Sequence, residues 1–293
     1  MFLERIRARR AIERRFAATG YRPSAETWYQ LHLAVARDLQ AQLLPPNVPV
    51  PSRRRALGFL KTIYKATGSI PVAVSALFRA GSWTSSGGSF RLADKMGVDI
   101  AQLVEKGIDS GGFTLLEVGG GWAGFHARQA ESDDLSLGHV ARLHKDHLGS
   151  RLHLHFTNLT QWHPSLPRGV TEHPYITAAN LSAAAINGIE PGTVDLIYSQ
   201  AAAYFEPDIE TFVRSAAAML RPGGQLLFNY PLDVEPDVLM GAASCGMHWE
   251  RSLLLGGMNG QVALFTNRVA ALTQTSRPAL PDDAAASRLN NAA

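Results

Sequence analysis

From Phe113 onwards, short runs of β-forming residues alternate with helical stretches, and this alternation restricts the fold more than any other feature. It is typical of a parallel sheet with helices on its faces, because each parallel strand needs a crossover back to the same edge. An Asn259-Gly260 pair between two apolar runs indicates a hairpin, and therefore an antiparallel edge. We expect an α/β fold with a doubly wound, mostly parallel sheet. The predicted strands are residues 113–118, 152–157, 175–178, 194–199, 225–229, 249–255 and 262–266.

The residues before Phe113 have a different pattern of apolar residues, which indicates helices separated by breaks. A second helix begins after Pro23, with Ser24 as its predicted N-cap. We therefore predict a helical N-terminal extension over 1–110, which forms a lid or an acceptor side, a sheet domain over 111–272 and a disordered tail over 273–293. The predicted helices before the sheet are residues 2–18, 24–44, 57–64, 72–78 and 98–106.

Charge and cysteine content narrow the class of protein. The chain has 293 residues and one cysteine, so a disulfide-rich secreted domain and a multi-cysteine zinc site are excluded. The longest apolar candidate, residues 70–78, is too short to span a membrane, and we expect a cytoplasmic protein. Residues 1–65 carry 13 Arg or Lys against 4 acids. This basic N-terminal arm could meet an acidic surface, although a solvated helix face is the simpler interpretation.

An apolar strand runs directly into three glycines in residues 115–124, LLEVGGGWAG, and we expect a helix directly after them over residues 125–130. Such a turn at the carboxyl end of a parallel strand allows a ligand to approach the main chain closely. Gly119, Gly121 and Gly124 also fit the dinucleotide pattern G-x-G-x-x-G. Glu117 argues against that interpretation, because a carboxylate beside the turn would repel a pyrophosphate.

The order of three motifs resembles that of the class I S-adenosylmethionine-dependent methyltransferases. Residues 117–124 (EVGGGWAG) resemble the family's first motif, residues 194–199 (VDLIYS) its fourth strand, and residues 219–224 (MLRPGG) the turn before its fifth strand. The triple glycine also resembles the bacterial sugar O-methyltransferase branch. The resemblance implies a Rossmann-like sheet and S-adenosylmethionine as cofactor.

The resemblance also implies which residues hold the cofactor. Asn158 stands where the family has an acid for the ribose hydroxyls, and Asp133 or Asp134 is the alternative if the second strand is misplaced. Asn180 stands where an acid meets the adenine amine. The full predicted set is Glu117, Gly119, Gly120, Gly121, Asn158, Asn180, Leu181 and Ser199. A valine at Gly119 should then remove cofactor binding while the chain stays folded.

Methyl transfer requires that the enzyme hold a nucleophile close to the methyl carbon and, where necessary, supply a base that removes its proton. Two candidates for the base are Glu206, in the loop after the fourth predicted strand, and His248, before the sixth. Histidines between residues 139 and 155 have spacings that a metal could use, but no cysteine is near them and no acid completes a ligand pattern, so we predict no metal site.

We therefore predict methyl transfer from S-adenosylmethionine to an oxygen or nitrogen of a small molecule, with a sugar as one possibility. Two alternatives stay open: an NAD(P)-dependent oxidoreductase that uses the same glycines, and a non-catalytic binding or scaffold protein. Nucleic acid is not expected as a partner, because the basic arm lacks interleaved aromatic residues. The sequence leaves the oligomeric state open.

Overall fold

The computed structural model describes residues 2–43, 55–78, 89–126, 135–200, 202–256 and 259–268. Its α-helices are α1 (Phe2–Thr19), α2 (Ala25–Ala41), α3 (Ala56–Thr67), α4 (Ile70–Phe78), α5 (Arg91–Lys95), α6 (Ile100–Asp109), α8 (Leu137–Leu143), α9 (Ile209–Met219) and α10 (Glu235–Ser244). Its strands are β1 (Phe113–Val118), β2 (Leu152–Asn158), β3 (Val170–Pro174), β4 (Val194–Ser199), β5 (Leu220–Tyr230), β6 (Met247–Leu254) and β7 (Gln261–Asn267). Short 3₁₀ segments are η2 (Lys145–His147), η3 (Ala178–Asn187), η4 (Ala203–Phe205) and η5 (Leu232–Val234).

The strands form one seven-stranded sheet in the order β3-β2-β1-β4-β5-β7-β6. The pairs from β3 to β5 are parallel, and β7 runs antiparallel to both β5 and β6. The predicted fold class, a Rossmann-like, mostly parallel sheet with an antiparallel C-terminal edge, is confirmed. Asn259 and Gly260 lie between β6 and β7, and Gly260 has the positive φ of 60° that the hairpin prediction requires.

Two sequence predictions are wrong in detail. The third strand is Val170–Pro174, not residues 175–178, because the chain leaves the extended region at Tyr175, whose φ is 65°. A helix was expected directly after the glycines, yet residues 121–124 form a turn and Phe125 is not helical. Ala123 (φ 49°) and Gly124 (φ 77°) are left-handed there, which prevents a right-handed helix from starting. The rest of that expected helix lies outside the described residues, as do Asp133, Asp134 and the predicted tail.

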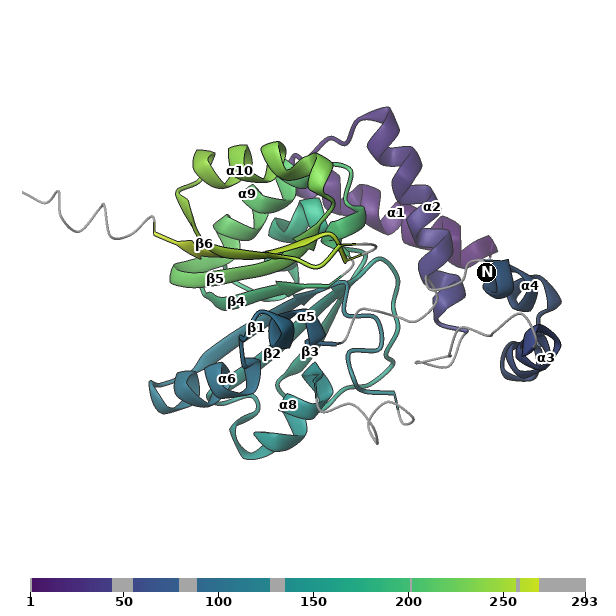
Figure 1. Cartoon of the computed structure of the whole chain (residues 1–293), viewed down its shortest axis with the longest axis horizontal. Coiled ribbons are helices and arrows are strands. Elements are labelled where there is room, and N and C mark those ends of the chain that lie inside the picture. The colour runs from purple at the N-terminus through teal and green to yellow at the C-terminus, as the bar shows by residue number, and fades with distance from the viewer. Residues whose placement is uncertain are drawn as a thin grey trace, which may run out of the picture.

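Helices cover both faces of the sheet. Figure 1 shows α9 and α10 over one face and α6 and α8 over the other, and the buried core divides accordingly into two clusters. On the second face, Val104 and Ile108 of α6 pack in one cluster with Leu115 of β1. The packing of the sheet unit therefore already includes residues 89–109, earlier than the predicted boundary at residue 110.

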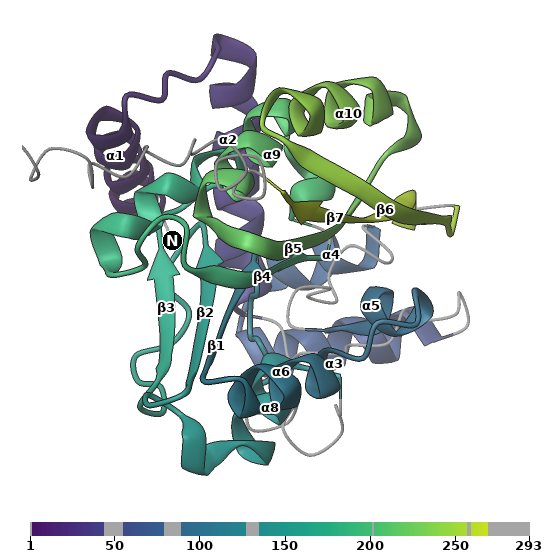
Figure 2. The same ribbon diagram turned by 90° about the vertical axis from the view of Figure 1, so that its left-hand side faces the viewer.

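The remaining N-terminal helices form two hairpins. The α1–α2 pair packs around Ile12 and Val35, and its cluster includes Leu159 and Tyr175, which follow β2 and β3. The pair therefore lies at the carboxyl edge of the sheet, as Figure 2 also shows. The α3–α4 pair has a separate small cluster of its own. None of the helices in the described ranges combines the length and hydropathy needed to cross a bilayer.

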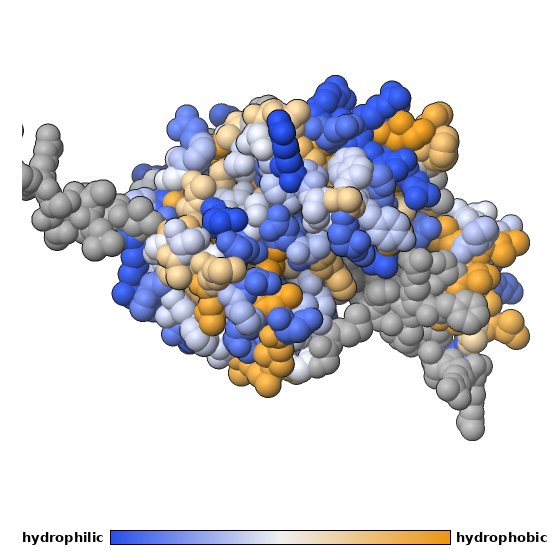
Figure 3. Space-filling model, turned by 90° about the horizontal axis from the view of Figure 1, so that it is seen from above, coloured by the Kyte–Doolittle hydropathy of each residue, from blue (hydrophilic) through white to orange (hydrophobic). Residues whose placement is uncertain are grey.

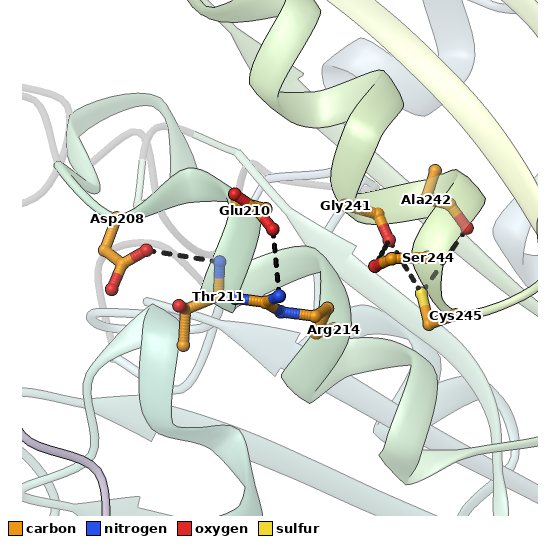
Figure 4. A network of polar contacts seen from close by, with 8 residues as sticks. All are labelled: Asp208, Glu210, Thr211, Arg214, Gly241, Ala242, Ser244 and Cys245. Atoms are coloured by element: carbon orange, nitrogen blue, oxygen red, sulfur yellow. Dashed lines mark hydrogen bonds and ion pairs between the residues drawn. The ribbon is translucent and has the colours of Figure 1, made fainter.

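Local side-chain bonds fix the helix ends. The predicted N-cap Ser24 is confirmed, since its Oγ accepts a hydrogen bond from the N–H of Thr27 at 3.1 Å. Asp208 caps α9 in the same way by accepting from the N–H of Thr211, and Glu210 pairs with Arg214 at 2.9 Å one turn later (Figure 4). A cap of this type stabilises a helix by about 1 kcal/mol. The N-cap Asp208 lies only two residues after the predicted base Glu206.

Candidate active site

The three glycines after β1 donate their main-chain N–H groups inside the protein. The N–H groups of Gly119 and Gly120 donate to the carbonyl of Thr157 at 3.0 and 3.1 Å. The N–H of Gly121 donates to Oδ1 of Asn158 at 2.8 Å. The turn is therefore held against the end of β2 and is a rigid element of the sheet edge.

Packing explains why Gly119 is a glycine. Its φ is 75°, and a Cβ at this position would lie 2.2 Å from the Cβ of Ala202 in the loop after β4. The methyl group of Ala202, 83 positions further along the sequence, therefore lies against the main chain of Gly119. Such contact brings the end of β1 and the end of β4 together at one edge of the sheet.

This geometry bears directly on the kind of ligand. A dinucleotide site binds its pyrophosphate through unsatisfied N–H groups at the start of a helix. Here the three glycine N–H groups are already bonded to Thr157 and Asn158, and no helix begins at residues 121–126. The turn thus lacks the anion-binding character that the G-x-G-x-x-G pattern suggests.

Two buried polar side chains flank the turn. Glu117, near the end of β1, is fully buried. Ser199, at the end of β4, donates to the carbonyl of Val118 at 3.2 Å and accepts from the N–H of Ala203 at 3.1 Å. Burial, and then the nearby Glu117 carboxylate, raises the pKa of Tyr198 far above its ordinary value. The environment next to the glycines is therefore apolar and contains a carboxylate, which suits a cationic ligand group.

The side chain of Asn158 hydrogen-bonds to two other elements of the protein. Besides accepting from Gly121, it donates from Nδ2 to Oε1 of Glu172 at 2.8 Å. The Glu172 carboxylate also accepts from the N–H groups of Trp162 and His163, each at 2.8 Å. Asn158 therefore connects the glycine turn to a carboxylate on the next strand, and that neighbour requires an amide rather than a second acid here.

Asn180 offers a buried, unpartnered donor. Its Oδ1 accepts from the hydroxyls of Thr19 at 2.9 Å and Ser182 at 3.2 Å. Its Nδ2 is buried without a hydrogen-bond partner, and the adjacent Leu181 is fully buried. An unsatisfied buried donor is costly, so it suits a place where a ligand supplies the acceptor.

Glu206 braces the loops on either side of it. Its Oε2 accepts from the N–H of Ala179 at 3.1 Å, and its Oε1 accepts from the N–H of Asp208 at 3.2 Å. Tyr21 of the N-terminal hairpin donates to Asp208 at 3.0 Å. Burial is the main cause that raises the pKa of Glu206 to about 7. Glu206 thus lies beside the segment that carries Asn180, with both oxygens engaged by main chain.

The structure does not bring His248 to this edge. His248 is exposed on β6, the edge strand, and β6 is four strand spacings from β1, or roughly 19 Å. Its register through Thr266 to Gln225 places it near the amino end of the parallel strands, whereas the glycine turn follows their carboxyl ends. His155 and His173, by contrast, lie within the sheet, where Nδ1 of His155 is 3.0 Å from Nε2 of His173. Burial lowers the pKa of both side chains.

A pocket of about 350 Å³ lies between α1, α2 and the loop after β2. Its polar and aromatic wall includes Gln42, Thr160, Trp162, His163 and Tyr175. The same wall contacts the glycine turn, since Nε2 of His163 lies 3.2 Å from the Gly121 carbonyl. The ring of Trp162 is 5.0 Å from that of Trp122 in the turn. The pocket and the glycine turn are therefore separated by a single layer of side chains.

Asp38 of α2 anchors this wall. Its Oδ2 accepts from the Thr160 hydroxyl and, at 3.0 Å, from the indole N–H of Trp162. Burial is the main cause that raises the pKa of Asp38 to about 6. Sequence reasoning missed Asp38, Trp162 and His163, because only the folded chain joins α2 to the loop after β2.

Comparisons with known proteins agree with this topology. Residues 151–228, from β2 to β5, match the family model described as a methyltransferase domain. A search of curated proteins found no match. The chain is similar to a TehB-like SAM-dependent methyltransferase from Corynebacterium glutamicum, with 17% identity, 61% of this chain and 94% of that chain covered, and a TM-score of 0.37. It is also similar to the CurJ carbon methyltransferase, with 13% identity, coverage of 87% and 70%, and a TM-score of 0.41.

The features of this chain that agree with such a domain are the family match over residues 151–228, the order of its strands and its glycine turn. The cofactor of such a domain is S-adenosylmethionine, and the residues at the turn fit it: a buried carboxylate, main chain without free anion-binding amides, and a buried amide donor. The family match over residues 151–228 and the order of the strands together support a class I S-adenosylmethionine-dependent methyltransferase domain in this chain.

Proposed function

We propose that this chain transfers the methyl group of S-adenosylmethionine to an oxygen or nitrogen of a small, hydroxyl-bearing molecule such as a sugar. The observation that carries the proposal is the glycine turn, whose three N–H groups are satisfied internally beside the buried Glu117. When bound, the cofactor supplies an electrophilic methyl group on a cationic sulfur.

Each predicted cofactor residue has a role in this proposal. The main chain of Gly119, Gly120 and Gly121 lies beneath the amino-acid end of the cofactor, and Glu117 balances its positive charge. The Nδ2 group of Asn180 donates to the adenine ring. The remaining three residues, Asn158, Leu181 and Ser199, shape the site by holding the turn, packing beside Asn180 and tying β4 to β1.

The chemistry of the pocket wall supports a hydroxylated acceptor. The Gln42 amide donates to the Thr160 hydroxyl, which donates to Asp38, so the two side chains form a polar wall that is held in place. Trp162 and Tyr175 supply aromatic surface. Polar groups of this kind orient hydroxyls, and aromatic groups cover the apolar faces of a ring. The α1–α2 hairpin forms the other side of the pocket, which supports the predicted acceptor role for this part of the N-terminal extension.

We assign proton removal to His163 rather than to His248. His163 lines the pocket and contacts the glycine turn, and burial, its largest influence, lowers its pKa. When its Nε2–H donates to Gly121, Nδ1 carries the lone pair that can accept a proton from the acceptor. Glu206 is a positioning residue in this proposal, because its two oxygens hold Ala179 and Asp208.

Two experiments test the proposal. Thermal unfolding with S-adenosylmethionine, S-adenosylhomocysteine and NAD should show stabilisation by the first two ligands only. Stabilisation by NAD alone would refute the assignment of the turn.

The second experiment measures transfer of labelled methyl to a panel of sugars and amines. Replacing the base typically costs 10²–10⁴-fold in rate, so His163→Gln should lower kcat by about that factor and leave the affinity for S-adenosylhomocysteine unchanged. His248→Gln is the matched control, since His248 is exposed on the edge strand, and it should keep the wild-type rate. The opposite pattern would return the catalytic role to His248.

A further inference from the structure

The segment that contains α3 and α4 has an unusual charge composition. Between Asp38 and Asp94 the sequence contains no acidic residue, while it contains seven arginines or lysines. In the α3–α4 hairpin these are Arg55, Lys61 and Lys65, all exposed. The hairpin is therefore purely cationic.

The same hairpin exposes large apolar side chains. Leu57 is 84% exposed and Ile70 64% exposed, and Tyr64 and Val74 are exposed as well. Figure 3 shows hydrophobic residues gathered at the right-hand end of the molecule, where Figure 1 places α3 and α4. Single exposed apolar residues are ordinary, but four on two short adjacent helices mark an interaction surface.

Within the described residues, packing against other elements does not account for these side chains. The buried cluster of the hairpin consists of Ile63, Val72 and Ala73, with Phe59 and Leu60 packed against it, and all five residues come from α3 and α4. Isolated helices of 12 and 9 residues are marginal in water. A partner that covers the exposed apolar side chains would therefore stabilise the hairpin.

The first turn of α1 presents a similar combination. Phe2 is 71% exposed and Leu3 is 72% exposed. Glu4, Arg5 and Arg7 follow them on the surface, so cations outnumber the single acid there. In Figure 1 the N-terminus and the α3–α4 hairpin lie at the same end of the molecule. A single broad surface could therefore contact both features at once.

We propose that the α3–α4 hairpin, together with the first turn of α1, docks on the surface of an anionic membrane. Apolar side chains enter the interfacial region of a bilayer, and lysines and arginines next to them bind anionic headgroups. The helices lie on the bilayer and do not cross it. Nucleic acid would pair with the cations but would leave Leu57 and Ile70 in water, so the lipid surface fits the observations better. This inference goes beyond the proposed methyl transfer and does not depend on it.

Vesicle sedimentation of the full chain tests the proposal. We expect binding to vesicles that contain one-quarter phosphatidylglycerol in phosphatidylcholine, and little binding to vesicles of phosphatidylcholine alone. High salt should weaken the binding, because it screens charges near the surface. Equal binding to both vesicles, or to neither, would overturn the proposal.

Charge and apolar variants identify the surface. The double variant Lys61→Gln/Lys65→Gln should weaken binding to anionic vesicles roughly 25-fold, about fivefold for each lysine removed. The matched control, Lys106→Gln/Lys145→Gln, removes two exposed lysines from α6 and η2 and should bind as wild type. Equal losses in both double variants would mean that net charge, not this surface, drives binding.

The apolar variants Leu57→Ser and Ile70→Ser should each weaken binding roughly tenfold. Thermal unfolding should be unchanged in both, because the two side chains are exposed and lie outside the buried cluster. Light scattering and binding to a short DNA duplex complete the test. A dimer that dissociates in Leu57→Ser, or binding to DNA without binding to vesicles, would assign the surface to another partner.

Discussion

The contact between Gly119 and Ala202 gives a prediction whose size follows from the structure. In Gly119→Ala, the new Cβ must adopt a φ of 75° and would lie 2.2 Å from the Cβ of Ala202. The left-handed backbone costs about 1–2 kcal/mol, and the overlap costs about 1–3 kcal/mol more. We therefore expect the free energy of unfolding to fall by about 2–5 kcal/mol, measured by urea denaturation. A side chain at Gly119 is therefore expected to lower stability in addition to removing cofactor binding.

A double-mutant cycle separates the two contributions. Ala202→Gly alone should cost about 0.5–1 kcal/mol and should remove the atom that the new Cβ meets. In that background Gly119→Ala should cost only the backbone strain, so the two substitutions should couple by about 1–3 kcal/mol. If Gly119→Ala costs the same in both backgrounds, the loops after β1 and β4 do not touch here, and the description of the site is wrong.

Three further substitutions in the loops around the site should change the stability of the protein. Burial raises the pKa of Glu206 to about 7, above its unfolded value of 4.5, so the contribution of Glu206 to native stability should be fully present below about pH 4.5 and should decline as the pH rises through about 7. In the wild type this decline should amount to on the order of 3 kcal/mol of unfolding free energy, and Glu206→Gln should abolish it. Urea denaturation of variant and wild type at several pH values across this range measures the difference. Asn158→Asp replaces the donor to Glu172 with a second carboxylate and should destabilise the fold by about 2–3 kcal/mol in urea denaturation; adding Glu172→Gln should partly reverse the loss, and no reversal would contradict the described pairing. Asp208→Ala removes both the cap of α9 and the acceptor of the Tyr21 hydroxyl, and should lower the thermal midpoint by an amount equivalent to about 2 kcal/mol, whereas an unchanged midpoint would contradict both contacts.

Much of the sheet could be predicted from the sequence because its strands are continuous apolar runs. The predicted bounds of β1 and β4 agree with the structure, since strands buried on both faces show an unbroken pattern. β3 could not be found in the same way. It is only five residues long and contains Glu172 and His173, while the more apolar run after it turns away at Tyr175.

The candidate site shows the same division between local and long-range information. The glycine turn and Glu117 could be recognised because they are contiguous in the sequence. The role of Asn158 could not, because it depends on Gly121 and on Glu172, which lie on other elements. His163 belongs to no sequence motif that would have marked it as functional. Its position shortly after the end of β2, at the edge where ligands bind in such sheets, is the one signal that could have drawn attention to it.

The central claim is that the turn after β1 holds S-adenosylmethionine through close main chain, a neighbouring carboxylate and the amide of Asn180. A crystal structure with S-adenosylhomocysteine tests this claim most directly. We predict that the ligand lies across the carboxyl ends of β1 and β4, with its adenine ring within hydrogen-bond distance of Nδ2 of Asn180. A ligand bound elsewhere on the chain, with Asn180 still buried against Thr19 and without a new partner, would contradict it.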